Sequence, residues 1–565
     1  MKKSQNFRSR ITRRSVLKGA AAIGLSLKAG IQSGKAKASG LNPIQIENAK
    51  PGTTDWLLTN TLTDPEIVFL NLTSGRSSTI EGYCSANSVR AGETLQIMVS
   101  ANPASAFDLD IYRTGYYGGT GGRLVRSYQG LSGTPQPDPP IGENFLRECQ
   151  WAPAVTFDIP QDWLSGVYLG KLTALTSGIQ SYIIFIVRDD RPCDLLFQCS
   201  ELTWNAYNRW PTSYSIYTRH TQNWSSTGAP SGTVSFNRPY ALLTHPVNPI
   251  DKSVGAGEFL PWEFPLSYWL EQYGYDVSYI SNIDTHADRS GLLRTKGFIS
   301  VGHDEYWTET MFDNVLNARN AGVSLAFLCG NSAICKVPLL ASSDGQAHRA
   351  TRREGWFLPL ADGQVVPPEL INETGFEPSI GPDGALLLGA RHPIGQGEAG
   401  LGQGAGDWTC TAPAHWLFEG TGMQAGDSID GLIGWEFHGE PLLDLPGMQI
   451  VAEGPAFKNN GMQNGTYTAT IYDGPHNNIV FNAATIWWAN GLSSPPGHLN
   501  PSRHGIAQQG PDPRVQQITK NLFDRIVGDN TLEVPATSLI GLGVLAGALL
   551  CSGIANIRRA IKSGQ

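Results

Sequence analysis

The pattern of apolar residues changes near Arg188-Asp-Asp-Arg-Pro192, and this change constrains the fold more than any other feature of the sequence. Before it, runs of strand length and composition alternate with turns rich in Gly, Pro, Asn and Asp, with little helical period. These runs are Glu66–Leu72, Thr94–Val99, Phe107–Arg113, Gly166–Ala174 and Gln180–Val187. Short strands at this spacing predict an N-terminal immunoglobulin-like β-sandwich over residues 44–190.

After that boundary, apolar runs alternate with stretches of helical period. Strands are predicted at Asp194–Gln198, Asp276–Ile280, Gly297–Val301 and Val323–Cys329, and helices at Leu266–Tyr273 and Glu309–Ala321. Strands that alternate with helices favour right-handed crossovers and a mainly parallel sheet. We therefore expect a multidomain β plus α/β protein. Residues 191–528 would form a doubly wound, mainly parallel α/β domain with an irregular insertion at about 338–406.

The N-terminus has the pattern of an export signal over residues 1–38. Arg13 and Arg14 precede an apolar run, Gly19–Leu27, and a small-residue cleavage site at Ala36-Lys-Ala38. Paired arginines in this setting are similar to a twin-arginine signal, which exports folded proteins, and the alternative is an ordinary secretory signal. Either signal would place the body of the protein in the periplasm or at the cell surface.

The C-terminus has an almost uncharged span at residues 534–557, followed by Arg558, Arg559 and Lys562. This length and composition predict a transmembrane helix that anchors the body outside the membrane. The alternative is a bacterial sorting tail, from which the span is later removed.

Charge and cysteine content exclude several classes of protein. The net charge of −8 over 565 residues argues against nucleic acid as a partner. The 8 cysteines contain no Cys-x-x-Cys pair, which argues against a zinc ribbon or a thioredoxin-like site, although Cys84 and Cys149 could form a disulfide across the first domain.

Polar side chains cluster directly after a predicted buried strand. His303, Asp304, Glu305 and Tyr306 follow the strand at Gly297–Val301. In an open parallel sheet, ligands bind at the carboxyl ends of the strands. The structural alternatives stay open: the two carboxylates could start the next helix, the histidine could bond to a backbone carbonyl, and the tyrosine could be an aromatic anchor.

Two further groups come from other strands. Cys329 and Asn331 end the strand at Val323–Cys329, and a nucleophilic cysteine there is an alternative chemistry, although the usual elbow motif is missing. Glu436 and His438 end the apolar run Gly431–His438. A glutamate within such a strand should be desolvated, which would raise its pKa and suit it to general acid or base catalysis.

Several motifs together resemble one known family, the large (beta) subunit of N,N-dimethylformamidase and its relatives. The motifs, in order, are Ile111–Gly119, Thr203–Arg209, Val301–Trp307, His415–Gly422 and Gly434–Phe437. The resemblance covers roughly Thr94 to Val527. It implies a sandwich domain joined to an α/β domain similar to glutamine amidotransferases. It also implies hydrolysis of an amide at a mononuclear iron (Fe3+) held by two tyrosines and a glutamate.

The resemblance also implies roles for particular residues. Tyr306 matches a tyrosine ligand of the metal, and Tyr268 and Glu354 are candidates for the other two ligands by chain order alone. Glu436 is the expected general base, and His303 a second catalytic residue. The implied partners are a small polar or amide substrate and either a small partner subunit or a second copy of the chain.

This sequence departs from the family at Ile334 and Cys335, where many relatives carry Tyr-Trp, so that the wall of the pocket is changed. Two rival interpretations remain. The same fold could be a non-catalytic cell-envelope or carbohydrate-binding protein whose aromatic residues stack on sugars, or a glutaminase-like enzyme that uses Cys329.

Overall fold

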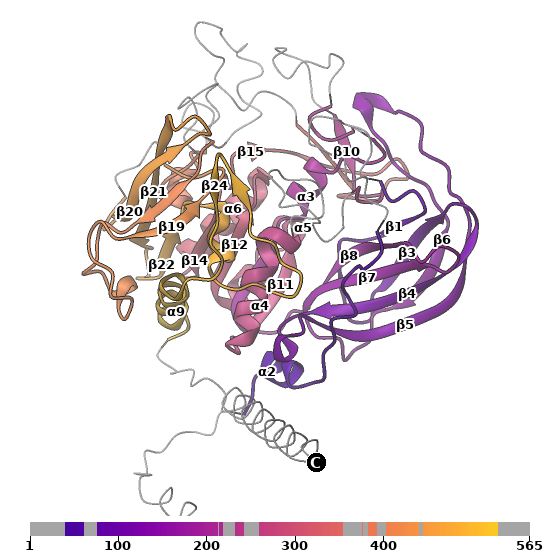
Figure 1. Ribbon diagram of the computed structural model, residues 1–565, viewed down its shortest axis with the longest axis horizontal. Coiled ribbons are helices and arrows are strands. Elements are labelled where there is room, and N and C mark those ends of the chain that lie inside the picture. Colours follow the sequence, from indigo (N-terminus) through magenta and orange to yellow (C-terminus); the bar gives the residue numbers. More distant parts are fainter. Residues whose placement is uncertain are drawn as a thin grey trace, which may run out of the picture. The chain divides into compact units, whose positions relative to one another are not determined.

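Two sheets of the N-terminal part enclose an apolar core. The computed structural model describes residues 40–61, 76–212, 214–218, 232–241, 259–353, 376, 382–392, 403–439 and 445–528. Chain contacts separate Met1–Leu41 from Asn42–Gln565, and the fold described below belongs to the second unit. Its N-terminal strands lie in the violet half of Figure 1.

The larger of these sheets has the strand order β2-β8-β7-β4-β5, and the smaller has the order β1-β3-β6. The bounds are β1 Ile80–Cys84, β2 Ser88–Arg90, β3 Thr94–Ala101, β4 Ser105–Thr114, β5 Gly122–Gly133, β6 Pro153–Asp158, β7 Gly166–Ala174 and β8 Gln180–Arg188. Alternate residues of β4 (Phe107, Leu109 and Ile111) are buried in one cluster with residues of β3. This period of two is what a strand with one face on a core requires.

A seven-stranded sheet follows, with the order β11-β9-β12-β14-β22-β21-β20. Its strands are β9 Cys193–Cys199, β11 Val277–Ser281, β12 Thr295–His303, β14 Ser324–Gly330, β20 Gln449–Phe457, β21 Gln463–Asp473 and β22 Ile479–Asn482. The five strands from β11 to β22 pair in parallel, whereas β21 and β20 pair antiparallel. This arrangement puts the carboxyl ends of β9, β11, β12 and β14 at one edge.

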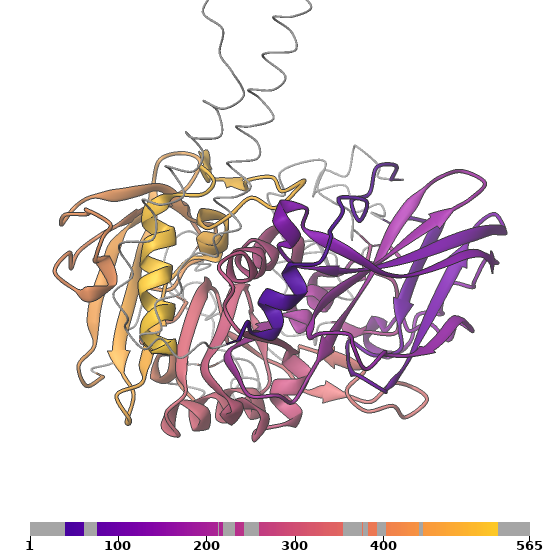
Figure 2. The same cartoon turned by 90° about the horizontal axis from the view of Figure 1, so that it is seen from below.

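The central strands of this sheet are buried on both faces. In β14, Leu325 and Phe327 belong to one apolar cluster, and Ala326 and Leu328 belong to another. The first cluster contains residues of α6 (Glu309–Asn320), and the second contains residues of α4 (Phe264–Gln272) and α9 (Pro513–Val527). Helix α9, yellow in Figure 2, runs along one face of the strands. Strands covered on both faces are expected to be apolar throughout, as these are.

A buried ion pair joins the two parts of the fold. Arg113 of β4 donates to both carboxylate oxygens of Glu271 in α4, at 2.8 and 3.0 Å, and neither side chain is exposed to solvent. Tyr117 and Tyr279 complete the network. The conspicuous run Ile111–Gly119 therefore has a structural role here, because its arginine holds the sandwich against α4.

The predicted fold class is wrong. The described ranges consist mainly of strands, which are distributed over several sheets, and they contain few helices. The prediction was drawn from the alternation of strands and helices up to Cys329. Beyond Cys329, the described residues form mostly strands that are too short or too irregular to show a period. They include β15 (Cys335–Lys336), β16 (Leu339–Leu340), β17 (Ala350–Arg352), β18 (Gly406–Thr409) and β19 (Ser428–Ile433).

The predicted C-terminal transmembrane helix is not supported either. Among the residues that the structure describes, no helix is both long and apolar enough to cross a bilayer, and α9 is amphipathic. Residues 534–557 and the predicted signal at 1–38 lie outside the described ranges.

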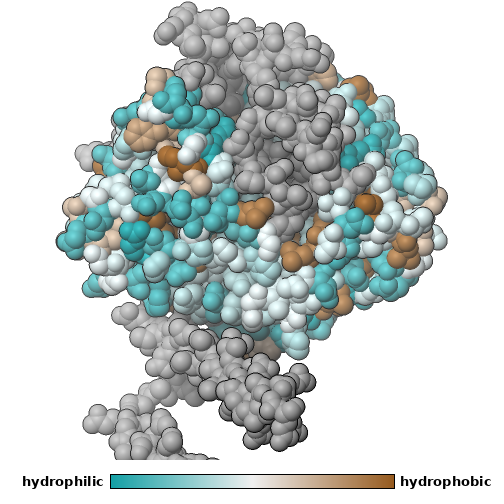
Figure 3. All heavy atoms as spheres, in the orientation of Figure 1, coloured by the Kyte–Doolittle hydropathy of each residue, from teal (hydrophilic) through white to brown (hydrophobic). Residues whose placement is uncertain are grey.

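The expected disulfide is also wrong, because Cys84 and Cys149 are both free thiols. The face in Figure 3 is mostly hydrophilic, with isolated apolar side chains.

Candidate active site

The carboxyl ends of β12 and β14 bring the central polar residues together. His303 is the last residue of β12 and lies opposite Gly330, the last residue of β14. Gly302 precedes it at φ +72°, and a Cβ there would lie 2.7 Å from the Cβ of Trp262. Only glycine satisfies both conditions without a shift of the chain, and it lets the strand turn so that the residues after His303 enter the site.

Four side chains form what we call the phenol cluster: Tyr207, Tyr217, Glu305 and Tyr306. The Tyr207 hydroxyl donates to Glu305 Oε2 at 2.5 Å. The Tyr217 hydroxyl lies 2.9 Å from that of Tyr207 and 3.4 Å from Glu305 Oε1. The Tyr306 hydroxyl donates to that of Tyr217. Two phenol oxygens therefore approach one carboxylate, and the third phenol joins them through Tyr217.

The cluster is assembled from three separate segments. Tyr207 is the last residue of α3 (Glu201–Tyr207), Tyr217 lies in the described segment 214–218, and Tyr306 begins β13 (Tyr306–Trp307). Thr203 of α3 binds β13 to the helix, because its hydroxyl accepts the backbone N–H groups of Glu305 and Tyr306 at 3.0 and 3.3 Å.

The environment keeps the phenols neutral in the absence of a cation. Burial of the hydroxyl ends raises the pKa of Tyr207, Tyr217 and Tyr306 well above the ordinary value of 10, and the nearby Glu305 carboxylate raises each further. A bound cation would oppose both effects, because it would stabilise the phenolates.

An imidazole lies between this cluster and a second carboxylate. His303 Nε2 is 3.2 Å from Glu305 Oε2 and 3.1 Å from Glu436 Oε2. Glu436 also accepts hydrogen bonds from Asn331 Nδ2 at 2.8 Å and from Gln403 Nε2 at 3.0 Å. Burial raises the pKa of Glu436, but the hydrogen bond and charge of His303, the charge of His392 and the hydrogen bond from Gln403 together outweigh burial, so the net pKa is lowered. The predicted rise in this pKa is therefore wrong.

Asn331 is held by an unusual turn after β14. Its φ is +55°, and the preceding Gly330 has no room for a side chain, because a Cβ there would lie 2.4 Å from the Glu436 carbonyl oxygen. The next residue, Ser332, donates its N–H to His438 Nε2 at 2.9 Å. Among the described residues, the buried Asn331 Oδ1 has no hydrogen-bond partner.

His438 supports this turn as a neutral imidazole. Its Nδ1 lies 2.9 Å from Asn482 Oδ1, while its Nε2 accepts from Ser332, so the proton is on Nδ1. Burial lowers the pKa of His438 to about 4. Asn482 is fixed in turn by the carbonyl oxygens of Leu388 and Ala390, at 3.0 Å each.

Of the other residues singled out in the sequence, those that the structure describes lie apart from this network. Tyr268 packs against Tyr116 and Phe264, with ring centroids at 5.1 and 6.0 Å, and it contacts no member of the phenol cluster in the described structure. Glu354 lies outside the described residues. Asp304 accepts from Gln198, Asn282 and Ser300 and braces the strand ends.

Cys329 is poorly suited to act as a nucleophile. It is fully buried, and burial raises the pKa of its thiol to about 12. Its contact with the Ser300 hydroxyl is 3.7 Å long. A thiol that stays protonated at neutral pH has little thiolate available for attack.

Sequence reasoning missed Tyr207 and Tyr217. Tyr207 lies within the motif Thr203–Arg209, but the resemblance implied no role for it, and Tyr217 lies in a polar segment without a period. No local signal points to their meeting at Glu305, because about 90 residues or more separate them from it in the chain.

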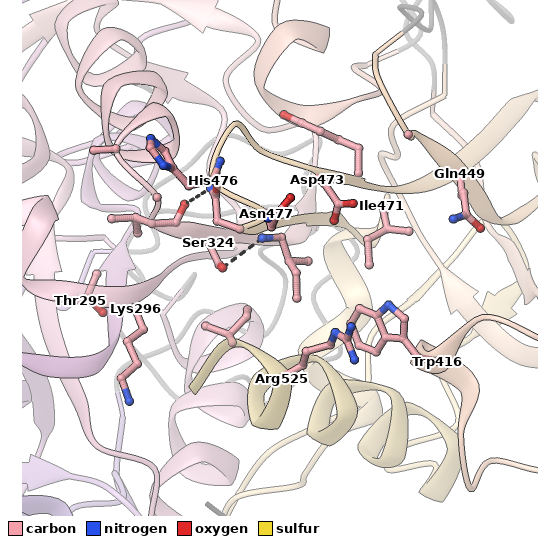
Figure 4. Close-up of a pocket in the computed structure, with 18 of the residues that line it drawn as sticks. Thr295, Lys296, Ser324, Trp416, Gln449, Ile471, Asp473, His476, Asn477 and Arg525 are labelled. Atoms are coloured by element: carbon pink, nitrogen blue, oxygen red, sulfur yellow. Dashed lines mark hydrogen bonds between the residues drawn. The ribbon is translucent and has the colours of Figure 1, made fainter. Parts of the chain in front are cut away.

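A pocket of about 910 Å³ lies elsewhere, near the amino ends of β12 and β14. Figure 4 shows it between Lys296, Asp473, His476 and the stacked pair Trp416 and Arg525. The residues of the phenol cluster do not line it. The buried cluster at the carboxyl ends is therefore a separate site from this pocket.

Comparison with known proteins agrees with the motifs in the sequence. A family model described as N,N-dimethylformamidase beta subunit-like, C-terminal, matches residues 108–503, which are most of the chain. No curated protein matches the chain. The matched range contains every residue of the phenol cluster, together with His303, Asn331 and Glu436. The protein thus belongs to the N,N-dimethylformamidase beta subunit-like family.

Proposed function

We propose that this protein is an iron-dependent amide hydrolase in which Tyr207, Tyr217 and Glu305 would hold the metal. The observation that supports this assignment is the convergence of the two phenol oxygens on the two oxygens of one carboxylate. Tyr268 and Tyr306, the ligands suggested by the sequence, make no such approach to Glu305 in the described contacts.

The donor set fits the metal that the family implies. Phenolate and carboxylate oxygens are hard donors that suit a trivalent ion. In the described ranges, no three His, Cys, Asp or Glu side chains are grouped to hold a metal, so a centre there would need the phenols. When bound, Fe3+ would polarise an amide carbonyl or acidify a water molecule.

The surrounding residues supply the proton transfers. Glu436 stays ionised at neutral pH in spite of its burial, because its neighbours lower its net pKa, so it can accept a proton from the attacking water. Water adds to the amide carbon, the C–N bond breaks, and the proton passes to the leaving amine. His303 holds Glu436 in position, and Asn331 Nδ2 donates to the same carboxylate.

The tryptophans that would favour sugar binding argue against that alternative. Trp204, Trp210, Trp487 and Trp488 are at most 2% exposed. Side chains buried to this extent cannot stack on a glycan.

The proposed ligand set is tested by metal analysis and visible spectroscopy of purified full-length protein. We expect one iron per chain and a tyrosinate-to-iron absorption band in the wild type, and loss of most iron in Tyr207→Phe and Tyr217→Phe. Tyr268→Phe is the matched control. It also removes a tyrosine hydroxyl, but Tyr268 contacts no member of the phenol cluster in the described structure, so this variant should keep the metal. A colourless, iron-free wild type, even after growth with added iron, would contradict the proposal.

We further propose that the substrate is a small polar amide and that a small partner subunit completes the enzyme. The family description, which names a beta subunit, supports a partner.

We also propose that the protein is exported, on the evidence of Arg13, Arg14 and the apolar run after them. Fusion of residues 1–38 to a reporter, in strains with and without the twin-arginine pathway, tests it. A reporter retained in the cytoplasm of both strains would contradict it.

A further inference from the structure

We infer that Tyr306 is a positioning residue outside the ligand set, whose hydroxyl donates a hydrogen bond to the metal-binding oxygen of Tyr217. This inference rests on the proposed function and goes beyond it, because it assigns the third phenol a separate role. It also differs from the sequence-based expectation that Tyr306 is itself a ligand.

The geometry of the phenol cluster distinguishes the three tyrosines. Tyr207 and Tyr217 each reach an oxygen of Glu305, at 2.5 and 3.4 Å. Tyr306 reaches the cluster through the Tyr217 hydroxyl. Its ring lies 6.1 Å from that of Tyr207, edge to face. A cation close to both oxygens of Glu305 would therefore meet two of the phenols directly and the third through Tyr217.

The Tyr306 side chain is fixed in this position. The residue has no exposed surface and packs in the apolar cluster that also contains Met311, Phe312 and Phe327. Its strand β13 pairs in parallel with β15, in the register Tyr306 to Cys335. A hydroxyl held on so rigid a frame can act as a constant donor to one oxygen.

The hydrogen bond from Tyr306 changes the electron density on the metal-binding oxygen of Tyr217. The Tyr306 hydroxyl donates to the Tyr217 oxygen and has no described hydrogen bond to Glu305, so its place in the cluster is that of a donor to Tyr217. A hydrogen bond to a metal-bound phenolate withdraws electron density from its oxygen, which weakens donation to the metal and raises the energy of the charge-transfer band. Tyr306 would thus keep the iron a stronger Lewis acid toward the substrate.

Cys335 offers a matched comparison within the same site. Its thiol lies 3.5 Å from Glu305 Oε1 and interacts electrostatically with the Tyr217 and Tyr306 hydroxyls, without a described hydrogen bond to either. The substitution Cys335→Ala changes the buried surroundings of Glu305, but it leaves the hydrogen bond from Tyr306 to Tyr217 in place. It therefore controls for general disturbance of the site.

The test compares iron content, the visible spectrum and the reduction potential of full-length wild type, Tyr306→Phe, Tyr217→Phe and Cys335→Ala. We expect Tyr306→Phe to keep iron at the wild-type stoichiometry, with its band at longer wavelength and a more negative Fe3+/Fe2+ potential. Tyr217→Phe should lose most of its iron. Cys335→Ala should retain both the iron and the position of the band.

Three outcomes separate the possibilities. Loss of iron in a folded Tyr306→Phe protein, or an unshifted band, would overturn the inference while the proposed function stands. A wild type without iron would overturn the proposed function itself. Resonance Raman of the wild type gives an independent reading if Tyr306→Phe does not fold: a tyrosinate C–O vibration that shifts in D2O is expected, and one that does not shift would overturn the inference.

Discussion

Glu436 keeps its negative charge at neutral pH in spite of burial, because His303, 3.1 Å away, and other neighbours lower its pKa. We expect Glu436→Gln to lower amide hydrolysis by roughly a hundredfold or more, since it removes the proposed proton acceptor and keeps the shape. Circular dichroism and iron content should be unchanged. Glu453→Gln, at an exposed position of β20, is the matched control and should retain full activity. Equal activity in the two variants would contradict the assigned role.

The lowered pKa of Glu436 also fixes the sign of a pH effect. A base is active when it is ionised, and this group stays ionised below its ordinary pKa of 4.5. The titration of Glu436 should therefore leave activity intact down to pH 4.5. An acid limb in kcat/KM above pH 6 that vanishes in Glu436→Gln would show that the pKa is raised.

The lowered pKa of His438 predicts that the free energy of unfolding depends on pH. Its pKa is about 4 in the fold and 6.5 in the unfolded chain, so the unfolded state binds a proton first as pH falls. Its contribution to stability is complete above pH 6.5 and is lost as pH falls toward 4, by about 3 kcal/mol in total. Denaturant unfolding of wild type and His438→Gln should show a smaller pH slope in the variant, and equal slopes would contradict this account.

At the scale of elements, the ion pair between β4 and α4 holds the sandwich against the seven-stranded sheet. Glu271→Ala should lower the free energy of unfolding by about 3–5 kcal/mol, because it leaves the Arg113 guanidinium charged and buried. The control is Glu309→Ala, which breaks the surface pair with Lys336 and should cost about 1 kcal/mol or less. If Glu271→Ala and Glu309→Ala unfolded at similar denaturant concentrations, this result would argue against a structural role for the Arg113–Glu271 pair.

The turn at the end of β12 gives a second prediction at this scale. Gly302→Ala should destabilise the fold by about 1–3 kcal/mol and disturb His303, because φ is positive and the new Cβ meets Trp262. Gly118→Ala has a similar φ of +65° but open space around its Cβ. Thermal melts should therefore show the larger loss for Gly302→Ala. The reverse order would mean that steric room is not what Gly302 provides.

At the scale of the whole molecule, local pattern predicted many elements but not their assembly. Strand β7 occupies Gly166–Ala174 and helix α6 begins at Glu309, as expected from composition and period. The fold class was wrong because the short strands after Cys329 leave no periodic signal. Such strands are defined by partners distant in the chain, and propensity does not reveal these.

The same distinction applies to the site. The sequence predicts that His303 and Glu305 lie at a strand end, at the edge where ligands bind, but it does not predict Glu305 as a metal ligand. Tyr207 and Tyr217 were not predicted at the site, because only the folded chain brings them to Glu305. Tyr268 was chosen by its order in the sequence, and the fold directs it toward Tyr116 instead. Order along a chain is a weak guide to a site assembled from distant segments.

The central claim is that iron lies among Tyr207, Tyr217 and Glu305. The most direct measurement is anomalous diffraction at the iron absorption edge from a crystal of the full-length protein. The account predicts one peak within bonding distance of both phenol oxygens and of the Glu305 carboxylate, with the Tyr306 oxygen outside that distance. A peak bonded to Tyr306 or Tyr268, or no iron peak in active protein, would contradict it.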